Sequence, residues 1–401
     1  MNYPFSGIVV RYLRHQAAAE MHTVERPMPL QDQLHVNLWD IADKAYLDIG
    51  LMVSEPESIS EIWIDVPWRV EPRQVVDLGP GLDGDKILTA IFNEVASYSG
   101  VSGQHYAVVT LGSHPNQDIP FLLVRLDQSR ITFSQIAIDT HSEVTRLQIR
   151  WPALNFSDST HQGLRRYIRI RLTHVHMDAF FSTFRAKDRN LLSSSPITRL
   201  LDFRVNVRRG VPDQVLLGEP ALEFPSLKKV HVFAIVPRET ELPFQGEGYK
   251  GCRSLEDEEI WNGYINLPHR SHAMHGESVK DYLGYQWTAS SKNDVPAKDL
   301  VALGRFVHVT SSRWTNARFL VVVMLLGTLG SAIWDEVKAI LGNADSNDQS
   351  WKQLPIWAIV PLSVLLTLLI TDRATARAFA KLIKQTWTSH TEAISSWWRG
   401  L

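Results

Sequence analysis

Short runs of alternating apolar and polar residues fill the first three quarters of the chain. The clearest runs are rich in β-branched and aromatic residues and are bounded by Gly, Pro, Asp or Asn, which is typical of strands. They cover residues 7–13, 33–40, 60–68, 105–112, 120–126, 131–139 and 228–237. Because helices do not alternate regularly with these strands, the pattern predicts a mainly β region with antiparallel sandwich-like or barrel-like architecture.

One segment of this region has the period of a helix instead. In "GDKILTAIFNEVASYSG" the apolar positions from Ile87 to Tyr98 fall on one helical face. Asp83 can cap the start of such a helix, and Gly100 can close its end. We therefore expect at least one helix in the β-rich region, near residues 84–99.

The pattern changes near the C-terminus, where two long uncharged stretches follow one another. Phe319–Trp334 has 16 residues without a charge, and Gln353–Thr371 has 19. A transmembrane helix needs about 20 mostly apolar residues, with roughly 17 as a lower limit. Two such stretches in tandem predict an α-helical transmembrane hairpin over residues 315–371, with spans at about 315–334 and 353–371. The alternative is a helical hairpin buried in the core of a soluble protein.

Charges around this hairpin predict its orientation. Basic residues precede the first span and follow the second, whereas the loop between the spans carries more acidic residues than basic ones. Because basic flanks stay on the cytoplasmic side, we expect both termini in the cytoplasm and the hairpin in an inner or plasma membrane. The tail at 372–401 is basic and rich in tryptophan. Its spacing suits an amphipathic helix in the headgroup layer, or a solvated helix that continues the second span.

Several residues of the hairpin have properties that suit a membrane anchor. Gly327 and Gly330 leave room for the close approach of another helix, and Pro361 kinks the second span or loosens its backbone ladder. Aromatic and basic side chains mark the interfaces with the headgroups. The predicted anchor residues are Arg318, Gly327, Gly330, Trp334, Trp357, Pro361, Arg373 and Arg377. The small-residue patch also favours a homo-oligomer that assembles through the hairpin.

Composition and domain organisation narrow the function classes. The 401 residues carry a formal net charge of −2, so bulk electrostatics disfavours nucleic acid as a partner. The single cysteine, Cys252, allows no disulfide within the chain, which suits a reducing cytosol. A polar stretch near Asn155–Gly163 is the predicted boundary between two β-rich cytosolic regions, residues 1–155 and 156–310.

Three predicted strands place arginine on one face and apolar residues on the other. They are "TRLQIRW", "YIRIRL" and "DFRVNVRR", and their candidate anion-binding residues are Arg146, Arg150, Arg169, Arg171, Arg204 and Arg208. If the three strands pair, their guanidinium groups form a surface suited to a phosphate or a nucleotide. The alternative is a solvated sheet face without a ligand.

Two histidine groups have the residue types of a metal site. His174, His176 and Asp178 in "THVHMD" have a spacing that several zinc hydrolases use at a strand end. The residues His269, His272 and His275 could supply further ligands. The alternative is that the first group is structural, because it continues a mostly apolar strand face, and that the second is solvated.

A glycine-rich turn, "VVDLGPGLDGD", precedes the predicted helix. It looks like the turn that brings a nucleotide or S-adenosylmethionine to a helix N-terminus. The segments after it read as antiparallel hairpins rather than a βαβ unit, so we expect an ordinary strand-to-helix turn and no cofactor. The chain has no Ser-His-Asp order, P-loop or CxxC motif, and we predict no catalytic residues.

These observations favour a membrane-anchored sensor or effector over an enzyme. We expect the cytosolic β-rich region to bind a protein partner or a nucleotide-like anionic ligand. We expect the hairpin to assemble in the bilayer and perturb it, as in a bacterial antiphage abortive-infection protein. This last step rests on architecture alone. The alternatives are a membrane-tethered metal-dependent hydrolase and a membrane-anchored scaffold or interaction protein.

Overall fold

The fold of residues 3–309 is built mainly from strands. The computed structural model describes residues 3–15, 32–41, 44–100, 105–112, 119–151, 161, 163–185, 196–217, 222–267, 278–293, 295–297 and 299–309, and seven helical positions between 320 and 334. The described residues within 3–309 contain three α-helices, α2 (Asp85–Phe92), α3 (Asp213–Leu216) and α4 (Glu258–Ile265), and 19 strands. The predicted mainly β character is confirmed.

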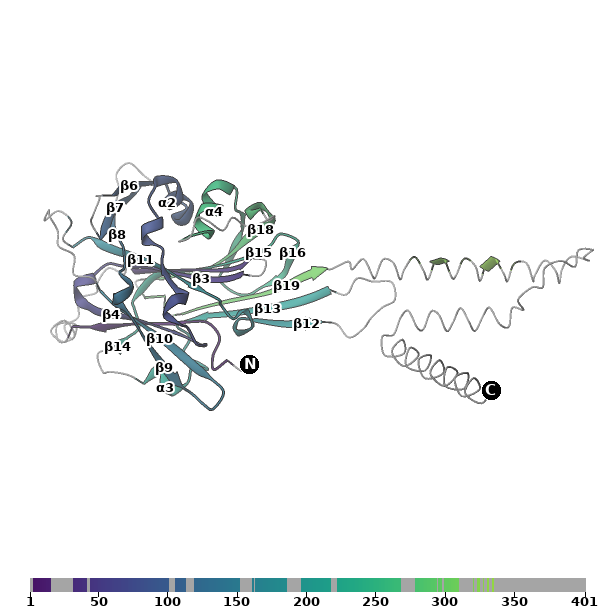
Figure 1. The fold of residues 1–401 in the computed structure, drawn as a ribbon, viewed down its shortest axis with the longest axis horizontal. Helices are drawn as coiled ribbons and strands as arrows, with labels where there is room; N and C mark the ends of the chain where they lie inside the picture. The colour runs from purple at the N-terminus through teal and green to yellow at the C-terminus, as the bar shows by residue number, and fades with distance from the viewer. Residues whose placement is uncertain are drawn as a thin grey trace, which may run out of the picture. The chain divides into compact units, whose positions relative to one another are not determined.

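The largest sheet has ten strands and crosses the middle of the β-rich unit (Figure 1). In spatial order they are β17 (Tyr249–Ser254), β18 (Tyr282–Ser290), β15 (Leu227–Pro237), β2 (Asp32–Ile41), β3 (Lys44–Val53), β11 (Arg165–Thr173), β8 (Ile119–Val124), β7 (Tyr106–Leu111) and β6 (Ala96–Gly100), with β5 (Val75–Asp77) beside β11. Two pairings, β15 with β2 and β11 with β8, are parallel. The antiparallel prediction therefore misses these two parallel pairs, which no hairpin can form.

Two smaller sheets complete the β structure of the described residues. The five-stranded sheet runs β14 (Leu222–Glu223), β1 (Val9–Arg14), β4 (Ile59–Val66), β10 (Glu143–Arg150) and β9 (Ile131–Ala137). The four-stranded sheet runs β12 (Phe181–Arg185), β13 (Pro196–Val205), β19 (Leu300–Val309) and β16 (Thr240–Gln245).

The two faces of the ten-stranded sheet bury different sets of side chains. On one face, Leu34 and Val36 of β2 pack into the main core with Ile62 and Leu147 of the five-stranded sheet. On the other face, a second core around Trp39 contains residues of α2 and α4. Figure 1 shows these helices on one side of the sheet and β4 and β10 on the other. Because successive side chains of a strand point to opposite faces, both faces of the central strands are covered.

The helix predicted near residues 84–99 is shorter than expected. α2 ends at Phe92, and residues 96–100 form β6, which pairs with β7. Asn93 has a left-handed conformation with φ 55° and ends the helix, as expected of a residue after the last helical turn. Thr89 Oγ1 then accepts a hydrogen bond from the Ala96 amide at 3.0 Å. The helical period of the sequence continues past Phe92, but sheet pairing decides the conformation there.

The chain divides into two compact units. Met1–Phe184 with Thr198–His308 forms the first, and Arg185–Ile197 with Val309–Leu401 forms the second. The polar stretch predicted as a boundary near Asn155–Gly163 lies mostly outside the described residues. Strands from both sides of it pair in the ten-stranded sheet, β3 with β11 and β2 with β15. The two predicted β-rich regions therefore share one sheet.

The second unit contains the predicted hairpin. Seven positions of its first span are helical and exposed: Leu320, Val323, Met324, Gly327, Gly330, Ser331 and Trp334. Within the described part of the chain, no helix is both long and apolar enough to cross a bilayer. The second span, the tail and the predicted anchor residues Arg318, Trp357, Pro361, Arg373 and Arg377 lie outside the described residues.

A buried cluster of charges joins three strands of the β-rich unit. Asp65 of β4 is fully buried and accepts hydrogen bonds from Arg11 of β1 at 2.7 Å and from Arg146 of β10 at 2.7 Å. The carbonyl oxygen of Val215 accepts further bonds from both arginines, which satisfies part of their donors. Removing the one carboxylate of such a cluster leaves buried cations without a counter-charge, which is more costly than losing an exposed pair.

We predict that Asp65→Asn destabilises the protein strongly, by about 3–5 kcal/mol. The matched control is Glu61→Gln, because Glu61 and Asp65 lie on the same strand and face Arg150 and Arg146 of β10. The Arg150 side chain of the control pair is 66 % exposed. Loss of the ion pair between Glu61 and Arg150 should therefore lower the free energy of unfolding by less than about 1 kcal/mol. Chemical unfolding of the purified full-length variants measures both effects, and equal losses would contradict the prediction.

Candidate anion-binding pocket

Of the six arginines predicted to form one surface, five lie on three different sheets, and Arg208 follows the end of β13 (Pro196–Val205). Arg146 and Arg150 are on β10 of the five-stranded sheet, Arg169 and Arg171 are on β11 of the ten-stranded sheet, and Arg204 is on β13 of the four-stranded sheet. The three strands do not pair, so the condition for the predicted surface is not met.

Outside β11, the predicted arginines have local partners. Arg146 pairs with the buried Asp65, and Arg150 with Glu61 at 3.4 Å. Arg204 donates to Asp202 of its own strand at 2.6 Å. The Arg208 guanidinium carbon lies 4.5 Å from the ring centroid of Phe224. These four side chains are held by neighbouring groups of the sheet surface.

On β11 the arginines are buried rather than solvated. Arg171 donates to both carboxylate oxygens of Asp48 at 2.6 and 3.0 Å, and to the Ile265 carbonyl oxygen at the end of α4 at 2.8 Å. Tyr264 of α4 donates to Asp48 at 2.6 Å. Burial alone would raise the pKa of Asp48, but the charges of Arg171 and Arg169, together with the hydrogen bonds from Arg171 and Tyr264, outweigh burial and lower that pKa. The arginine face of β11 is therefore covered by α4.

Arg169 belongs to the same network but has no carboxylate of its own there. It is 1 % exposed, and it donates to the hydroxyl oxygens of Tyr264 at 2.6 Å and Tyr167 at 2.8 Å. Its third contact is the Asn37 amide oxygen at 2.9 Å. None of the ion pairs among the described residues includes Arg169, so two arginines share the charge of Asp48 and one positive charge is left over.

Gly50 provides the space for this arrangement. It lies directly opposite Arg169 in the pairing of β3 with β11. A Cβ atom at this position would come within 2.1 Å of the Tyr167 hydroxyl oxygen and 3.1 Å of Arg169 Nη1. Because no real Cβ contact is as short as 2.1 Å, any other residue would displace the tyrosine and its hydrogen bond to Arg169.

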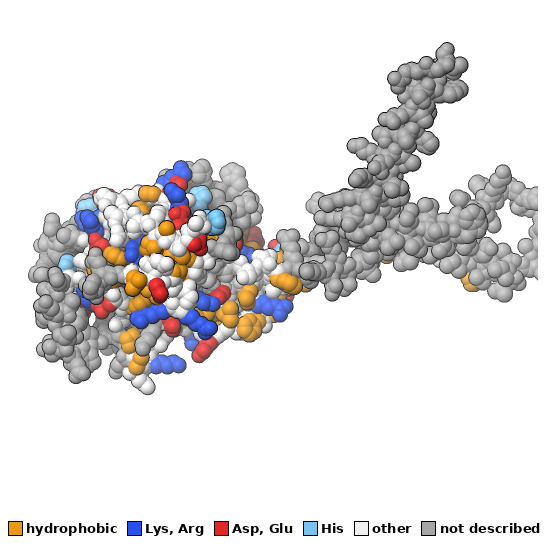
Figure 2. Space-filling view, turned by 90° about the horizontal axis from the view of Figure 1, so that it is seen from below, with side chains coloured by type: hydrophobic (Ala, Val, Ile, Leu, Met, Phe, Trp, Pro, Cys, Tyr) orange, Lys and Arg blue, Asp and Glu red, His pale blue; other side chains and the backbone are white. Residues whose placement is uncertain are grey.

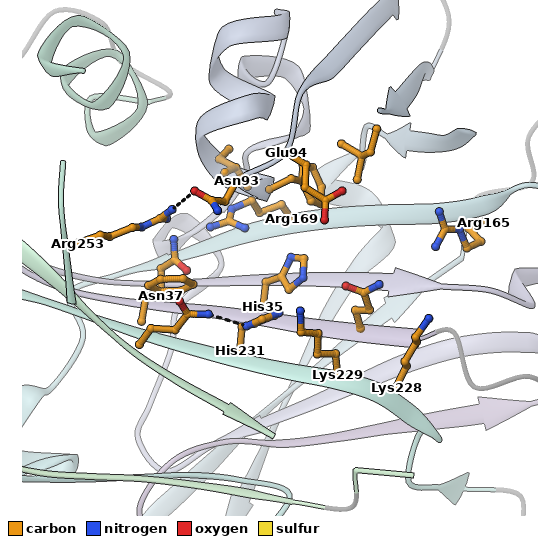
Figure 3. Close-up of a pocket in the computed structure, with 16 residues that line it drawn as sticks. His35, Asn37, Asn93, Glu94, Arg165, Arg169, Lys228, Lys229, His231 and Arg253 are labelled. Atoms are coloured by element: carbon orange, nitrogen blue, oxygen red, sulfur yellow. Dashed lines mark hydrogen bonds between the residues drawn. The ribbon is translucent and has the colours of Figure 1, made fainter. Parts of the chain in front are cut away.

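Arg169 lies in the wall of a pocket on the helix-covered side of the ten-stranded sheet (Figure 3). The cavity has a volume of about 470 Å³, within the usual range for small-molecule sites. Its described lining comprises Gln33, His35, Asn37, Ile91, Phe92, Asn93, Glu94, Leu111, Arg165, Arg169, Lys228, Lys229, His231, Phe233, Arg253 and Gln286. This set contains five cationic side chains and one carboxylate.

The pairing register of the strands determines which side chains face each other on the floor of this pocket. In the parallel pair of β2 and β15, Gln33 lies opposite Lys229, His35 opposite His231, and Asn37 opposite Phe233. Gln286 of β18 lies opposite Phe233 on the other side of β15. The floor therefore has three successive levels, each made of residues that face each other across the paired strands. The first level contains Lys229, and the second contains His35 and His231. The third contains Asn37, Phe233 and Gln286.

The two histidines are neutral hydrogen-bonding groups near neutral pH. Burial, helped by the nearby Lys229 and Arg253, lowers the pKa of His231 to about 4. Burial, His231 and Arg169 hold the pKa of His35 well below its ordinary value. The side-chain nitrogen of Gln286 lies 3.0 Å from His231 Nδ1. An amide nitrogen can only donate, so Nδ1 accepts and the ring proton lies on Nε2.

Charge in this pocket contrasts with the face drawn in Figure 2. On the face drawn in Figure 2, basic, acidic and hydrophobic side chains are interspersed, in line with the net charge of −2. In the pocket, only Glu94 among the described lining residues is acidic. Burial lowers the pKa of Arg165, and the Glu94 carboxylate opposes this effect. The pocket thus gathers hydrogen-bond donors and positive charge, which is the chemistry of an anion site.

The described residues among the predicted metal ligands do not form a group that could hold a metal ion. His174 is exposed with φ 58°, which ends the strand face that was expected to continue to His176. His176 accepts from or donates to the Tyr3 hydroxyl at 3.1 Å and stacks on Trp68. No group of three potential metal ligands occurs among the described residues. The residues His269, His272 and His275 lie outside them.

The glycine-rich turn has a structural explanation in this fold. The Asp77 carboxylate accepts the amides of Gly79 at 3.0 Å and Leu126 at 2.7 Å. A Cβ at Gly81 would lie 2.5 Å from the side chain of Leu267. β5 pairs antiparallel with β11, so the turn does not belong to the βαβ unit that nucleotide-binding turns need.

The chain matches no protein-family model and no curated protein. The functional argument therefore rests on the geometry of the pocket.

Of the six predicted arginines, all of them within the described residues, Arg169 alone lines this pocket. The other cations of the pocket, Arg165, Lys228, Lys229 and Arg253, and its two histidines are not among the residues predicted from the sequence. The signal that could have found them is the polar face of β2 and β15, where Gln-x-His-x-Asn and Lys-x-His-x-Phe alternate with apolar residues. That pattern ordinarily indicates a solvated face, and only the pairing of the two strands reveals a site.

The low pKa of His231 predicts a pH dependence of stability. Its unfolded pKa is near 6.5 and its folded pKa about 4, so the unfolded chain binds more protons between these values and stability falls as the pH drops through them. Between pH 7 and 4.5 the wild type should lose about 2–3 kcal/mol more than His231→Asn. Asp77, whose pKa burial raises to about 7, gives the opposite slope in both proteins and cancels in the comparison.

Urea unfolding of both full-length proteins at the two pH values measures this difference. Asn is chosen because its amide oxygen can replace Nδ1 as an acceptor for Gln286. If the wild type and His231→Asn lose the same free energy of unfolding between the two pH values, His231 is not held neutral in the folded protein and the prediction is wrong.

Proposed function

We propose that this protein is a membrane-attached sensor or effector whose β-rich unit binds a small anion in the pocket around Arg169. The observation that carries the proposal is the excess of cations in a cavity whose wall includes Arg169, a buried guanidinium that makes no direct ion pair among the described residues. Burying a charge is costly unless an opposite charge approaches it. An anion in the pocket supplies that charge and replaces water around the lysine and arginine side chains.

The predicted hairpin is the second part of the proposal. It rests on the uncharged segments Phe319–Trp334 and Gln353–Thr371 and is consistent with the exposed helical positions between 320 and 334. In this proposal both termini face the cytoplasm, and the hairpin assembles in an inner membrane and increases its permeability. In a bacterial host this would be the effector step of an abortive-infection response.

The β strands suggest a route between the two parts. β16 connects β15 with β17, and both of these strands contribute cations to the pocket. β16 also pairs with β19, the last strand before the hairpin segment. A change in the position of β15 or β17 on ligand binding would therefore be passed to β19 through one ladder of hydrogen bonds. This is a route of contact, and its coupling energy is a matter for experiment.

Binding of pyrophosphate to the purified full-length chain tests the pocket. Lys228→Gln with Lys229→Gln should weaken binding at least tenfold, because each charge contributes about 1 kcal/mol at the distances of an exposed site. Glu94→Gln should tighten binding several-fold, because it removes the opposing carboxylate. Lys250→Gln, an exposed residue of β17 outside the pocket, is the matched control. The proposed anion site would be contradicted if pyrophosphate does not bind, or if all variants change its binding equally.

Membrane activity is tested by inducible expression of the full chain in a bacterium. Leu326→Arg with Val364→Arg places a charge at the centre of each predicted span, where it costs about 2.5–3.5 kcal/mol of insertion free energy. We expect the wild type to partition with membranes and depolarise the cell when the ligand is present, and the arginine variant to do neither. Leu326→Ile with Val364→Ile should behave as the wild type. A wild type that never alters membrane potential or growth, phage infection included, would contradict the effector role.

A further inference from the structure

The two ends of the pocket have different chemistry. Figure 3 shows Arg165, Lys228 and Lys229 on one side of the central histidines, and Asn37 and Arg253 on the other. The register agrees, because Lys229 and Phe233 lie at the first and third levels of β15. Lys228 is exposed and Lys229 half-buried, so these side chains can move to meet a ligand. The first end offers three cations.

The opposite end offers an aromatic ring edged by amides. Phe233 is half-buried, and the Arg253 guanidinium carbon lies 4.6 Å from its ring centroid. Arg253 in turn donates to the Asn93 amide oxygen at 3.3 Å. Gln286 lies beside Phe233 in the pairing of β15 with β18, and none of the described residues donates a hydrogen bond to its amide oxygen. An aromatic ring, a guanidinium plane and amide groups are what proteins use to stack and read a nucleobase.

The distance between the ends sets the size of the ligand. Lys229 and Phe233 are four residues apart on one strand, which corresponds to roughly 13 Å. A single phosphate ion cannot contact both, and it would leave most of the 470 Å³ cavity empty. A compound that joins a phosphate to a planar ring through a sugar spans this length.

We propose that the anion recognised by this pocket is a nucleoside phosphate. The phosphate lies at Arg165, Lys228 and Lys229, His231 donates through Nε2–H to its sugar or phosphate oxygens, and the base stacks at Phe233. This inference rests on the proposed anion site and adds the class of the ligand. It also explains why a site for a charged ligand retains an aromatic ring at one end.

The test compares ligands that carry one or both parts. Calorimetric titration of the purified full-length chain with pyrophosphate, adenosine, and the mono- and triphosphates of adenosine, guanosine, cytidine and uridine measures each dissociation constant. We expect at least one nucleotide to bind ten times more tightly than pyrophosphate and far more tightly than adenosine. Phe233→Leu should reduce that advantage about tenfold while leaving pyrophosphate binding unchanged, which also shows that the variant is folded.

Phe244→Leu is the control, because Phe244 of β16 is an exposed phenylalanine outside the pocket. If Phe233→Leu does not fold, Gln286→Glu offers a second measurement, since a new carboxylate beside the ring should weaken nucleotides more than pyrophosphate. If pyrophosphate binds as tightly as every nucleotide, and neither variant separates them, the nucleotide class is wrong and the anion site remains. If no phosphate compound binds, the proposed anion site itself is wrong.

Discussion

The carboxylate of Asp48 holds the helix-covered side of the ten-stranded sheet together. It is fully buried, and it accepts hydrogen bonds from Trp39 of β2, Arg171 of β11 and Tyr264 of α4. One charged group thus joins three strands, including its own β3, to the helix above them. In a water-poor environment this charge requires cations, and the cations require it. The position of α4 and the burial of the arginine face of β11 both follow from this pairing.

The candidate site arises because the network contains one cation too many. Arg171 takes the direct contacts with Asp48, and Arg169 reaches the same carboxylate only through the Tyr264 hydroxyl. Gly50 leaves the space in which Arg169 and Tyr167 meet. Where the second core ends, near His35, the sheet floor becomes polar and the pocket opens beside the Arg169 guanidinium. The buried network and the candidate anion site therefore share Arg169.

Neutral histidines are a physical consequence of such a pocket. His35 and His231 are surrounded by Arg169, Lys229 and Arg253, so a proton on either ring meets like charge as well as burial. Both rings then act as neutral hydrogen-bonding groups instead of as additional charges. A bound anion would raise the pKa of each histidine toward its ordinary value, because a negative charge favours the protonated rings. Ligand binding and proton uptake would then be linked in the same site.

The sequence by itself identified ten of the 19 described strands, whereas β3, β18 and β19 were among those it did not predict. Leu34 and Val36 alternate with Gln33, His35 and Asn37 because a strand has a period of two residues, and the apolar set was recognisable as core. The same local rule showed an apolar and an arginine face on β11, and the uncharged runs near the C-terminus led to the membrane prediction. The end of α2 at Phe92 was not recognisable, because helix periodicity continued where sheet pairing took over.

Only the tertiary structure decided what covers each polar face and which strands lie side by side. His35 and His231 are 196 residues apart, and a parallel pairing that no turn specifies puts them at one level of the sheet. The arginines of β10, β11 and β13 have similar sequence patterns but lie on different sheets, because pairing depends on long-range packing. Periodicity reports the direction of a side chain relative to its own strand, whereas a site depends on partners that distant segments supply.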